Sequence, residues 1–287
     1  MTVKRYVHHH NGEVFESAFV RDPVSGALRS VQLVQLSGRK PGEAYSLGQT
    51  GLLLFEDRFE NGLCGWTWLM HRYAPVPGPV WSPWRGIGTG SALLMTGPVR
   101  PDDPSMGGDS TAIKRVMLPR DELGAYRGIV EYEVILGWAS DDPDHPAWWG
   151  IGIDTQRGDI TNRRQYYQLH FVNFDEDTQE RVQQFRVRTS EGQVYVPGMK
   201  LRHWNEAKAG SLHLRLRVDI VAERYVAAWL NGQYFDLSGF AGPNDHYVGS
   251  ESGYFDEGLN FSVDLTNRYD VSKPAMLHLD YARAVIL

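Results

Sequence analysis

The chain has 287 residues, with 29 Lys and Arg against 35 Asp and Glu, which gives a net charge of −6 at pH 7. This acidic balance argues against a nucleic-acid-binding protein, because such proteins neutralise phosphates with clustered Lys and Arg. Apolar residues make up 42% and charged residues 22%, an ordinary globular mixture that excludes wholesale disorder. The 30 glycines and the 12% of aromatic residues favour turns and strands over helices.

The sequence has one cysteine, Cys64, which excludes an internal disulfide and a cysteine-based zinc site. The N-terminal residues contain no apolar stretch as long as that of a signal peptide. The longest apolar runs, such as residues 52–55, are too short to cross a bilayer. We therefore expect a cytoplasmic protein without membrane contact. An extracellular location stays open, because a leader removed earlier would leave no trace.

Two parts are predicted along the chain. Residues 1–51 are polar and weakly periodic, and they are interpreted as an N-terminal extension packed on or beside the body. From residue 52 onward, short runs of alternating apolar and polar residues recur between turn residues. This pattern predicts one antiparallel β-sandwich domain over residues 52–287. Within it, the region 71–110 is rich in Pro and Gly and is predicted to form long loops.

The clearest predicted strands alternate strictly. In residues 212–220, every second side chain from Leu212 to Ile220 is apolar and is predicted to face the core. The same pattern predicts strands in residues 129–136, 148–154, 165–171, 184–188, 260–265 and 276–286. The pair Asn231 and Gly232 lies between two such runs and predicts a hairpin, because both turn positions need positive φ. No segment has a long amphipathic helical pattern.

Four segments in this order resemble the concanavalin A-like lectin and glucanase superfamily, which includes laminin-G-like and carbohydrate-binding modules. Residues 55–66 read FEDRFENGLCGW and resemble its first strand, and residues 88–95 resemble its second. Residues 212–232 are similar to its central hairpin, and residues 277–285 to its closing strand. The resemblance covers residues 52–287. It implies an all-β fold, an antiparallel two-sheet jelly-roll sandwich.

The resemblance also implies a structural calcium site. Several carbohydrate-binding modules of this kind hold Ca²⁺ with acidic residues of the first strand and an aspartate of the last strand. The matching residues in this sequence are Asp57, Glu60 and Asp280. Ca²⁺ takes six to eight oxygen ligands, and the terminal strands of such a sandwich pair side by side. The alternative is that these carboxylates lie at strand ends in solvent.

A second expectation is a sugar-binding sheet face. Trp148 lies at the start of one predicted strand, and Tyr166, Gln168 and His170 share the face of the next strand that points away from its apolar residues. Arg186 and Arg188 hold the same position on a third strand. Aromatic rings stack on sugars, and Arg binds carboxylates in bidentate fashion, which suits an extended or anionic glycan. The alternative is an ordinary solvated face on which Arg covers Tyr rings.

The third expectation concerns catalysis. Glu131 and Glu133 are two residues apart on one predicted strand face, about 7 Å from each other along the strand, a spacing compatible with the acid and base of a glycosidase. The glucanase branch of the superfamily carries an E-x-D-x-x-E signature, whereas here the third acidic position holds Leu136. The alternative is a pair of solvent-facing glutamates without catalytic function.

These observations lead to two hypotheses of different classes. The first is a sandwich protein that binds or processes carbohydrate, with a glycoside hydrolase or lyase activity left open because no catalytic signature is complete. The second is a structural or protein-interaction module without sugar chemistry. No organic cofactor is expected, and a homodimer is conceivable because sandwich domains often pair through exposed edge strands.

Overall fold

The structure is a computed structural model that describes most of the chain. The described residues are 4–10, 13–21, 28–33, 52–69, 79–82, 90–97, 108–116, 128–138, 146–157, 163–175, 178, 180–201, 212–243, 245–246, 258–268 and 274–287. Their regular elements are all strands. Among these residues no helix is long and apolar enough to span a bilayer.

Nineteen strands are present in the described residues. They are β1 (Lys4–His10), β2 (Glu13–Arg21), β3 (Leu28–Leu33), β4 (Leu52–Asp57), β5 (Thr67–Leu69), β6 (Val80–Ser82), β7 (Ser91–Met95), β8 (Asp109–Val116), β9 (Ile129–Trp138), β10 (Pro146–Arg157), β11 (Arg163–Phe174), β12 (Arg181–Thr189), β13 (Gly192–Tyr195), β14 (Leu212–Asp219), β15 (Arg224–Leu230), β16 (Gln233–Asp236), β17 (Asp245–His246), β18 (Gly258–Asn267) and β19 (Met276–Ile286).

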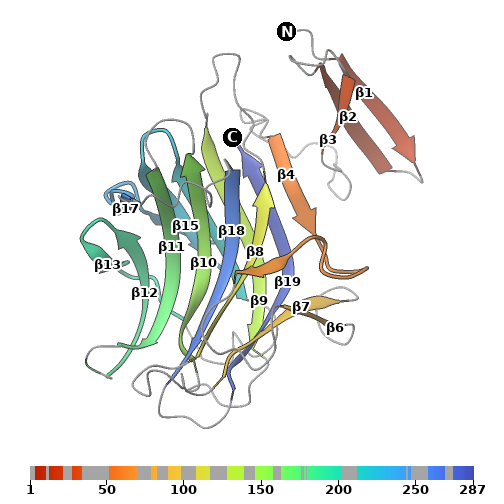
Figure 1. Cartoon of the computed structure of the whole chain (residues 1–287). Helices are drawn as coiled ribbons and strands as arrows, with labels where there is room; N and C mark the ends of the chain where they lie inside the picture. The colour runs from red at the N-terminus through yellow and green to blue at the C-terminus, as the bar shows by residue number, and fades with distance from the viewer. Residues whose placement is uncertain are drawn as a thin grey trace.

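Most strands form two antiparallel sheets. The first, here called the β10 sheet, has the order β13-β12-β11-β10-β18-β8-β5, with β17 paired to β11. The second, the β9 sheet, has the order β16-β15-β14-β9-β19-β7-β6, with β4 paired to β19. Figure 1 shows β12, β11, β10, β18 and β8 side by side in one layer, with β9 and β19 in the other. The predicted fold, an antiparallel two-sheet jelly-roll sandwich, is confirmed.

The core lies between the sheets and consists of the alternating apolar residues. In β14 the burial alternates without exception along the strand, as the sequence pattern predicts. In β10 the side chains of Trp149, Ile151 and Ile153 are fully buried, and in β11 so are Tyr167 and Leu169. Each buried side chain of this size stabilises the fold by about 1.5–3 kcal/mol relative to exposure.

Aromatic rings connect the two sheets. Phe261 of β18 lies 5.1 Å from Phe55 of β4 and 5.1 Å from Tyr132 of β9, measured between ring centroids. Phe55 in turn meets Trp66 edge to face at 6.2 Å. Because β18 belongs to one sheet and β4 and β9 to the other, this cluster fixes how the sheets pack on each other.

The predicted hairpin joins β15 to β16. Asn231 and Gly232 have φ angles of 50° and 84°, and the strands on either side pair from Leu230 with Gln233 onward. The prediction that region 71–110 forms long loops is wrong in part, since it contains β6, β7 and the start of β8. Short alternating runs flanked by Pro and Gly predict strands only weakly. These segments become strands because they pair with neighbouring strands in the sheets.

The strands β1, β2 and β3 form a three-stranded antiparallel sheet of their own, in that order. The pairs run from Lys4 with Phe19 to His10 with Glu13, and from Glu16 with Leu33 to Arg21 with Leu28. The boundary predicted between residues 51 and 52 stays a prediction.

The aromatic cluster gives a stability prediction. Phe261→Ala removes a fully buried ring that touches both sheets, so we expect the free energy of unfolding to fall by about 3–5 kcal/mol. Urea denaturation measures it. Tyr234→Ala is the control, because the Tyr234 side chain is 57% exposed, and a change within about 0.5 kcal/mol is expected there. Equal losses in both variants would contradict the assigned packing.

Candidate functional site

The outer face of the β10 sheet carries a row of polar side chains. Register places Gly150 of β10 between His170 of β11 and Asp264 of β18. Two residues further along β10, Gly152 lies between Gln168 of β11 and Ser262 of β18. This face would normally be solvated, yet most of these side chains are buried. His170 and Asp264 are each only 2% exposed.

The two glycines make room for neighbouring rings. A methyl group at Gly150 would collide with the Leu169 carbonyl and the His170 ring, and one at Gly152 would collide with the Tyr166 ring and the Ser262 hydroxyl. The side chains of His170 and Tyr166 therefore extend from β11 across β10 toward β18. The absence of Cβ atoms on the middle strand is what lets β11 and β18 exchange side-chain contacts.

Asp264 is the centre of these contacts. The Tyr166 hydroxyl lies 2.8 Å and 3.0 Å from its two carboxylate oxygens, and the Thr111 hydroxyl donates to Oδ1 at 2.8 Å. Ser262 Oγ donates at 3.2 Å, and His170 Nε2 lies 3.4 Å from Oδ2. Four residues on three strands thus surround one carboxylate, which satisfies a buried negative charge.

The electrostatics follow from this environment. Burial alone would raise the pKa of Asp264, but the hydrogen bond and charge of His170, together with the Thr111 and Tyr166 hydroxyls, outweigh it and hold the pKa of this carboxyl below its ordinary value. Burial and the Asp264 charge instead hold the pKa of the Tyr166 phenol well above its ordinary value. At neutral pH, Asp264 is therefore an ionised acceptor and Tyr166 a neutral donor.

An aromatic side chain borders this polar centre. The ring of Trp148, on β10, stacks on the His170 ring with 4.5 Å between centroids and 19° between planes. Trp148 is partly exposed, whereas His170 beneath it is buried. The arrangement combines a partly exposed apolar ring with buried hydrogen-bonding groups, as in sites that bind amphipathic ligands.

A side chain of the opposite sheet holds the backbone at Gln168 and Arg188 in place. The Tyr225 hydroxyl, from β15 of the other sheet, donates to the Arg188 backbone carbonyl at 2.7 Å and accepts from the Gln168 backbone N–H at 2.9 Å. The guanidinium of Arg186 donates through both NH groups to Asp175 Oδ2, each at 3.0 Å. Arg186 is thus engaged by a carboxylate of its own chain.

The structure brings part of the predicted sugar-binding set together. Trp148, Tyr166 and His170 form one connected group, and Gln168 lies on the same face. Sequence reasoning missed Asp264, Ser262 and Thr111, which complete the group. A signal for Ser262 and Asp264 was present, since residues 260–265 alternate polar and apolar. That pattern gives the face of each side chain but not its partner on another strand.

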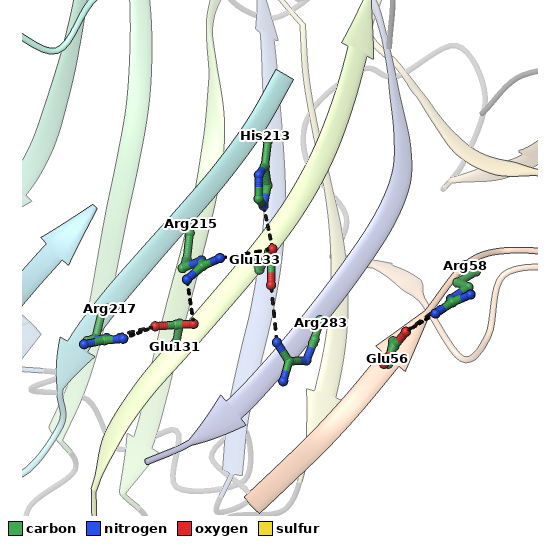
Figure 2. A network of polar contacts seen from close by, with 8 residues as sticks. All are labelled: Glu56, Arg58, Glu131, Glu133, His213, Arg215, Arg217 and Arg283. Atoms are coloured by element: carbon green, nitrogen blue, oxygen red, sulfur yellow. Dashed lines mark hydrogen bonds and ion pairs between the residues drawn. The ribbon is translucent and has the colours of Figure 1, made fainter. Parts of the chain in front are cut away.

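The predicted catalytic residues lie on the opposite side of the sandwich. Figure 2 shows Glu131 and Glu133 on the outer face of the β9 sheet, between arginines of β14 and β19. Arg217 Nε donates to Glu131 at 2.9 Å, and Arg215 lies 3.4 Å from each glutamate. Both Glu131 and Glu133 are therefore paired with arginines.

Glu133 also accepts from His213, with 2.6 Å between Oε1 and Nε2, and lies 3.5 Å from Arg283. Burial would raise its pKa, but the His213 hydrogen bond and the charges of Arg215 and Arg283 outweigh it, so the pKa of Glu133 lies below its ordinary value. A general acid needs a raised pKa. The catalytic role of Glu131 and Glu133 stays a prediction that these contacts do not support.

The calcium site at Asp57, Glu60 and Asp280 stays a prediction, which the contacts of these residues do not support. No group of three or more His, Cys, Asp or Glu side chains that suits a metal occurs among the residues described above. Asp57 Oδ2 accepts from Trp66 Nε1 at 2.9 Å and from the Lys114 ammonium at 2.6 Å. Glu60 is exposed, and Asp280 is buried in β19. A lysine ammonium next to the Asp57 carboxylate does not fit a calcium site, because the two cations would repel each other.

Comparisons with known proteins give likenesses of structure only. No family model matches the chain, and no curated protein matches it. Peanut lectin is similar with a TM-score of 0.47 and 10% identity, over 81% of this chain and 96% of the lectin. A lectin from Bauhinia forficata in complex with GalNAc has a TM-score of 0.45 and 10% identity, over 82% and 98% of the two chains. A Bacillus licheniformis β-glucanase has a TM-score of 0.42 and 17% identity, over 82% and 99%. The fold assignment rests on the strand order of this chain itself.

The buried carboxylate gives a pH prediction. Because its pKa is lower in the folded protein than in the unfolded chain, its stabilising contribution is fully present above a pH of about 4 and is lost as the pH falls through the folded-state pKa. We expect Asp264→Asn to lower the free energy of unfolding at neutral pH by about 1–3 kcal/mol. Below a pH of about 4, the stability of the variant should decline less steeply than that of the natural protein.

Denaturant unfolding at a series of pH values measures both effects. Glu191→Gln, which changes an exposed carboxylate in the turn between β12 and β13, is the control. Stability curves that run parallel for the natural protein and the Asp264→Asn variant would show that Asp264 does not carry this linkage.

Proposed function

We propose that the protein binds a carbohydrate on the outer face of the β10 sheet, at the stacked pair of Trp148 and His170. The observation that carries the proposal is the placement of the partly exposed Trp148 indole directly above the buried His170 ring, whose Nε2 lies 3.4 Å from Asp264. The proposal concerns binding, and it does not depend on Glu131 or Glu133, which lie on the other sheet.

The chemistry of sugars suits this arrangement. A sugar ring has apolar C–H faces, which stack on aromatic rings, and hydroxyl groups, which need hydrogen-bonding partners. Trp148 supplies the ring, and Gln168 and Tyr166 of β11 lie on the same face, with the Tyr166 hydroxyl held by Asp264. Because the Asp264 contacts hold Tyr166 and His170 in place before a ligand arrives, little conformational entropy is lost on binding.

The charges on this face bear on the kind of sugar. The sequence suggested an anionic glycan because of Arg186 and Arg188. Arg186 is already paired with Asp175, and the centre of the face holds the ionised Asp264. These contacts weaken the argument for an anionic ligand, and the ligand panel therefore includes uncharged glycans as well as uronic-acid polymers.

Binding to a glycan array tests the proposal. We expect the natural protein to bind at least one glycan, and Trp148→Ala to weaken that binding by about tenfold or more, as removal of a central aromatic contact does. Trp229→Ala is the matched control. Trp229 lies on the outer face of the β9 sheet, edge to face with Tyr234 and beneath Arg215 and Arg217, and its loss should leave binding unchanged.

Two outcomes would contradict the proposal. One is the absence of binding to every glycan by the natural protein, folded as judged by its unfolding transition. The other is binding that Trp148→Ala leaves intact while Trp229→Ala removes it, which would move the site to the opposite sheet.

A further inference from the structure

A lysine and an aspartate join the two sheets inside the sandwich. Lys114 lies on β8, opposite Phe261 of β18 in the β10 sheet. Asp57 ends β4, which pairs with β19 in the β9 sheet. The ammonium of Lys114 lies 2.6 Å from Asp57 Oδ2. The pair therefore crosses from one sheet to the other, at the edge of the Phe55 and Phe261 cluster.

The pair is largely removed from solvent and has further partners. The two side chains are 15% and 9% exposed. Lys114 Nζ also donates to the carbonyl of Cys64 at 2.6 Å and lies 4.9 Å from the centre of the Phe55 ring. Trp66 Nε1 donates to the same oxygen of Asp57 at 2.9 Å.

The backbone of the loop after β4 brings a carbonyl oxygen next to the Lys114 ammonium. Phe59 and Cys64 have φ angles of 56° and 52°, in the left-handed region that non-glycine residues seldom adopt. The Trp66 amide donates to the Leu63 carbonyl at 2.8 Å and closes the turn. This backbone course places the Cys64 carbonyl next to the ammonium. Such strain persists where surrounding contacts over-determine the conformation.

We infer that the ammonium of Lys114 takes the position next to Asp57 in which a calcium ion was expected. A carboxylate and a backbone carbonyl converge on one point, and these are oxygen ligands of the kind that Ca²⁺ takes. That point is occupied by a covalently attached positive charge, which would repel a second cation at this distance. The connection between the sheets therefore needs no metal. This inference is independent of the proposed carbohydrate binding.

The pair has a stabilising role only if its two members depend on each other. Removing one member of a buried ion pair leaves the other charge uncompensated, which is strongly destabilising, whereas removing both costs less than the sum. An ion pair that contributes nothing would give small and additive effects.

Melting temperatures test both parts of the inference. For the natural protein we expect the same melting temperature in EDTA and in millimolar CaCl₂. For Lys114→Met and for Asp57→Asn we expect falls of about 8 °C or more, and for the double variant a fall no larger than that of either single variant. Lys200→Met, which changes an exposed lysine, should melt as the natural protein does.

Each contrary result overturns a stated part. A rise in the melting temperature of the natural protein with CaCl₂ that EDTA reverses and Asp57→Asn abolishes would show that a metal ion is bound at Asp57 and that Lys114 does not replace it. Falls that add in the double variant, or falls no larger than that of Lys200→Met, would show that the two charges do not hold the sheets together.

Discussion

Strand β18 imposes the constraint on which the rest of the sandwich depends, because all ten of its residues are buried. Its inner side chains, such as Phe261 and Val263, belong to the apolar core. Its outer side chains, such as Ser262 and Asp264, are polar and equally removed from water. A buried polar group is costly unless it is hydrogen-bonded. The outer face must therefore supply its own partners, and the contacts around Asp264 are the result.

Charge is neutralised in three different ways within one fold. Asp264 is surrounded by hydroxyl donors and a histidine. Glu131 and Glu133 alternate with arginines on an outer sheet face. Asp57 meets a lysine between the sheets. On the outer face of the β9 sheet, the arginines and glutamates compensate each other's charges. On the outer face of the β10 sheet, the partly exposed Trp148 ring lies over the buried His170. This difference is why the β10 face is the better candidate for ligand binding.

Alternation in the sequence predicted the faces of β10, β11, β14 and β9, because side chains of a strand point to opposite sides in turn. It could not predict partners. His170 and Asp264 are separated by 94 residues, and no local pattern indicates that the glycine of the strand between them lets them meet. The same limit applies to the calcium prediction, which did not anticipate the lysine at Asp57. That prediction rested on the segment around Asp57. Lys114 is 57 residues away, and no local pattern connects its segment with Asp57.

The order of the strands has a consequence for how the protein folds. β18 lies between β10 and β8 in the middle of one sheet, and β19 lies between β9 and β7 in the middle of the other. Both come after residue 257 in the chain. Neither sheet is continuous until these two strands have been synthesised, so β8, β9 and β10 have unpaired edges during translation. Such edges are open to pairing with other chains, and non-local pairing of this kind is slow. Protection of these edges by chaperones during synthesis would therefore matter more for this protein than for a sandwich whose central strands come first.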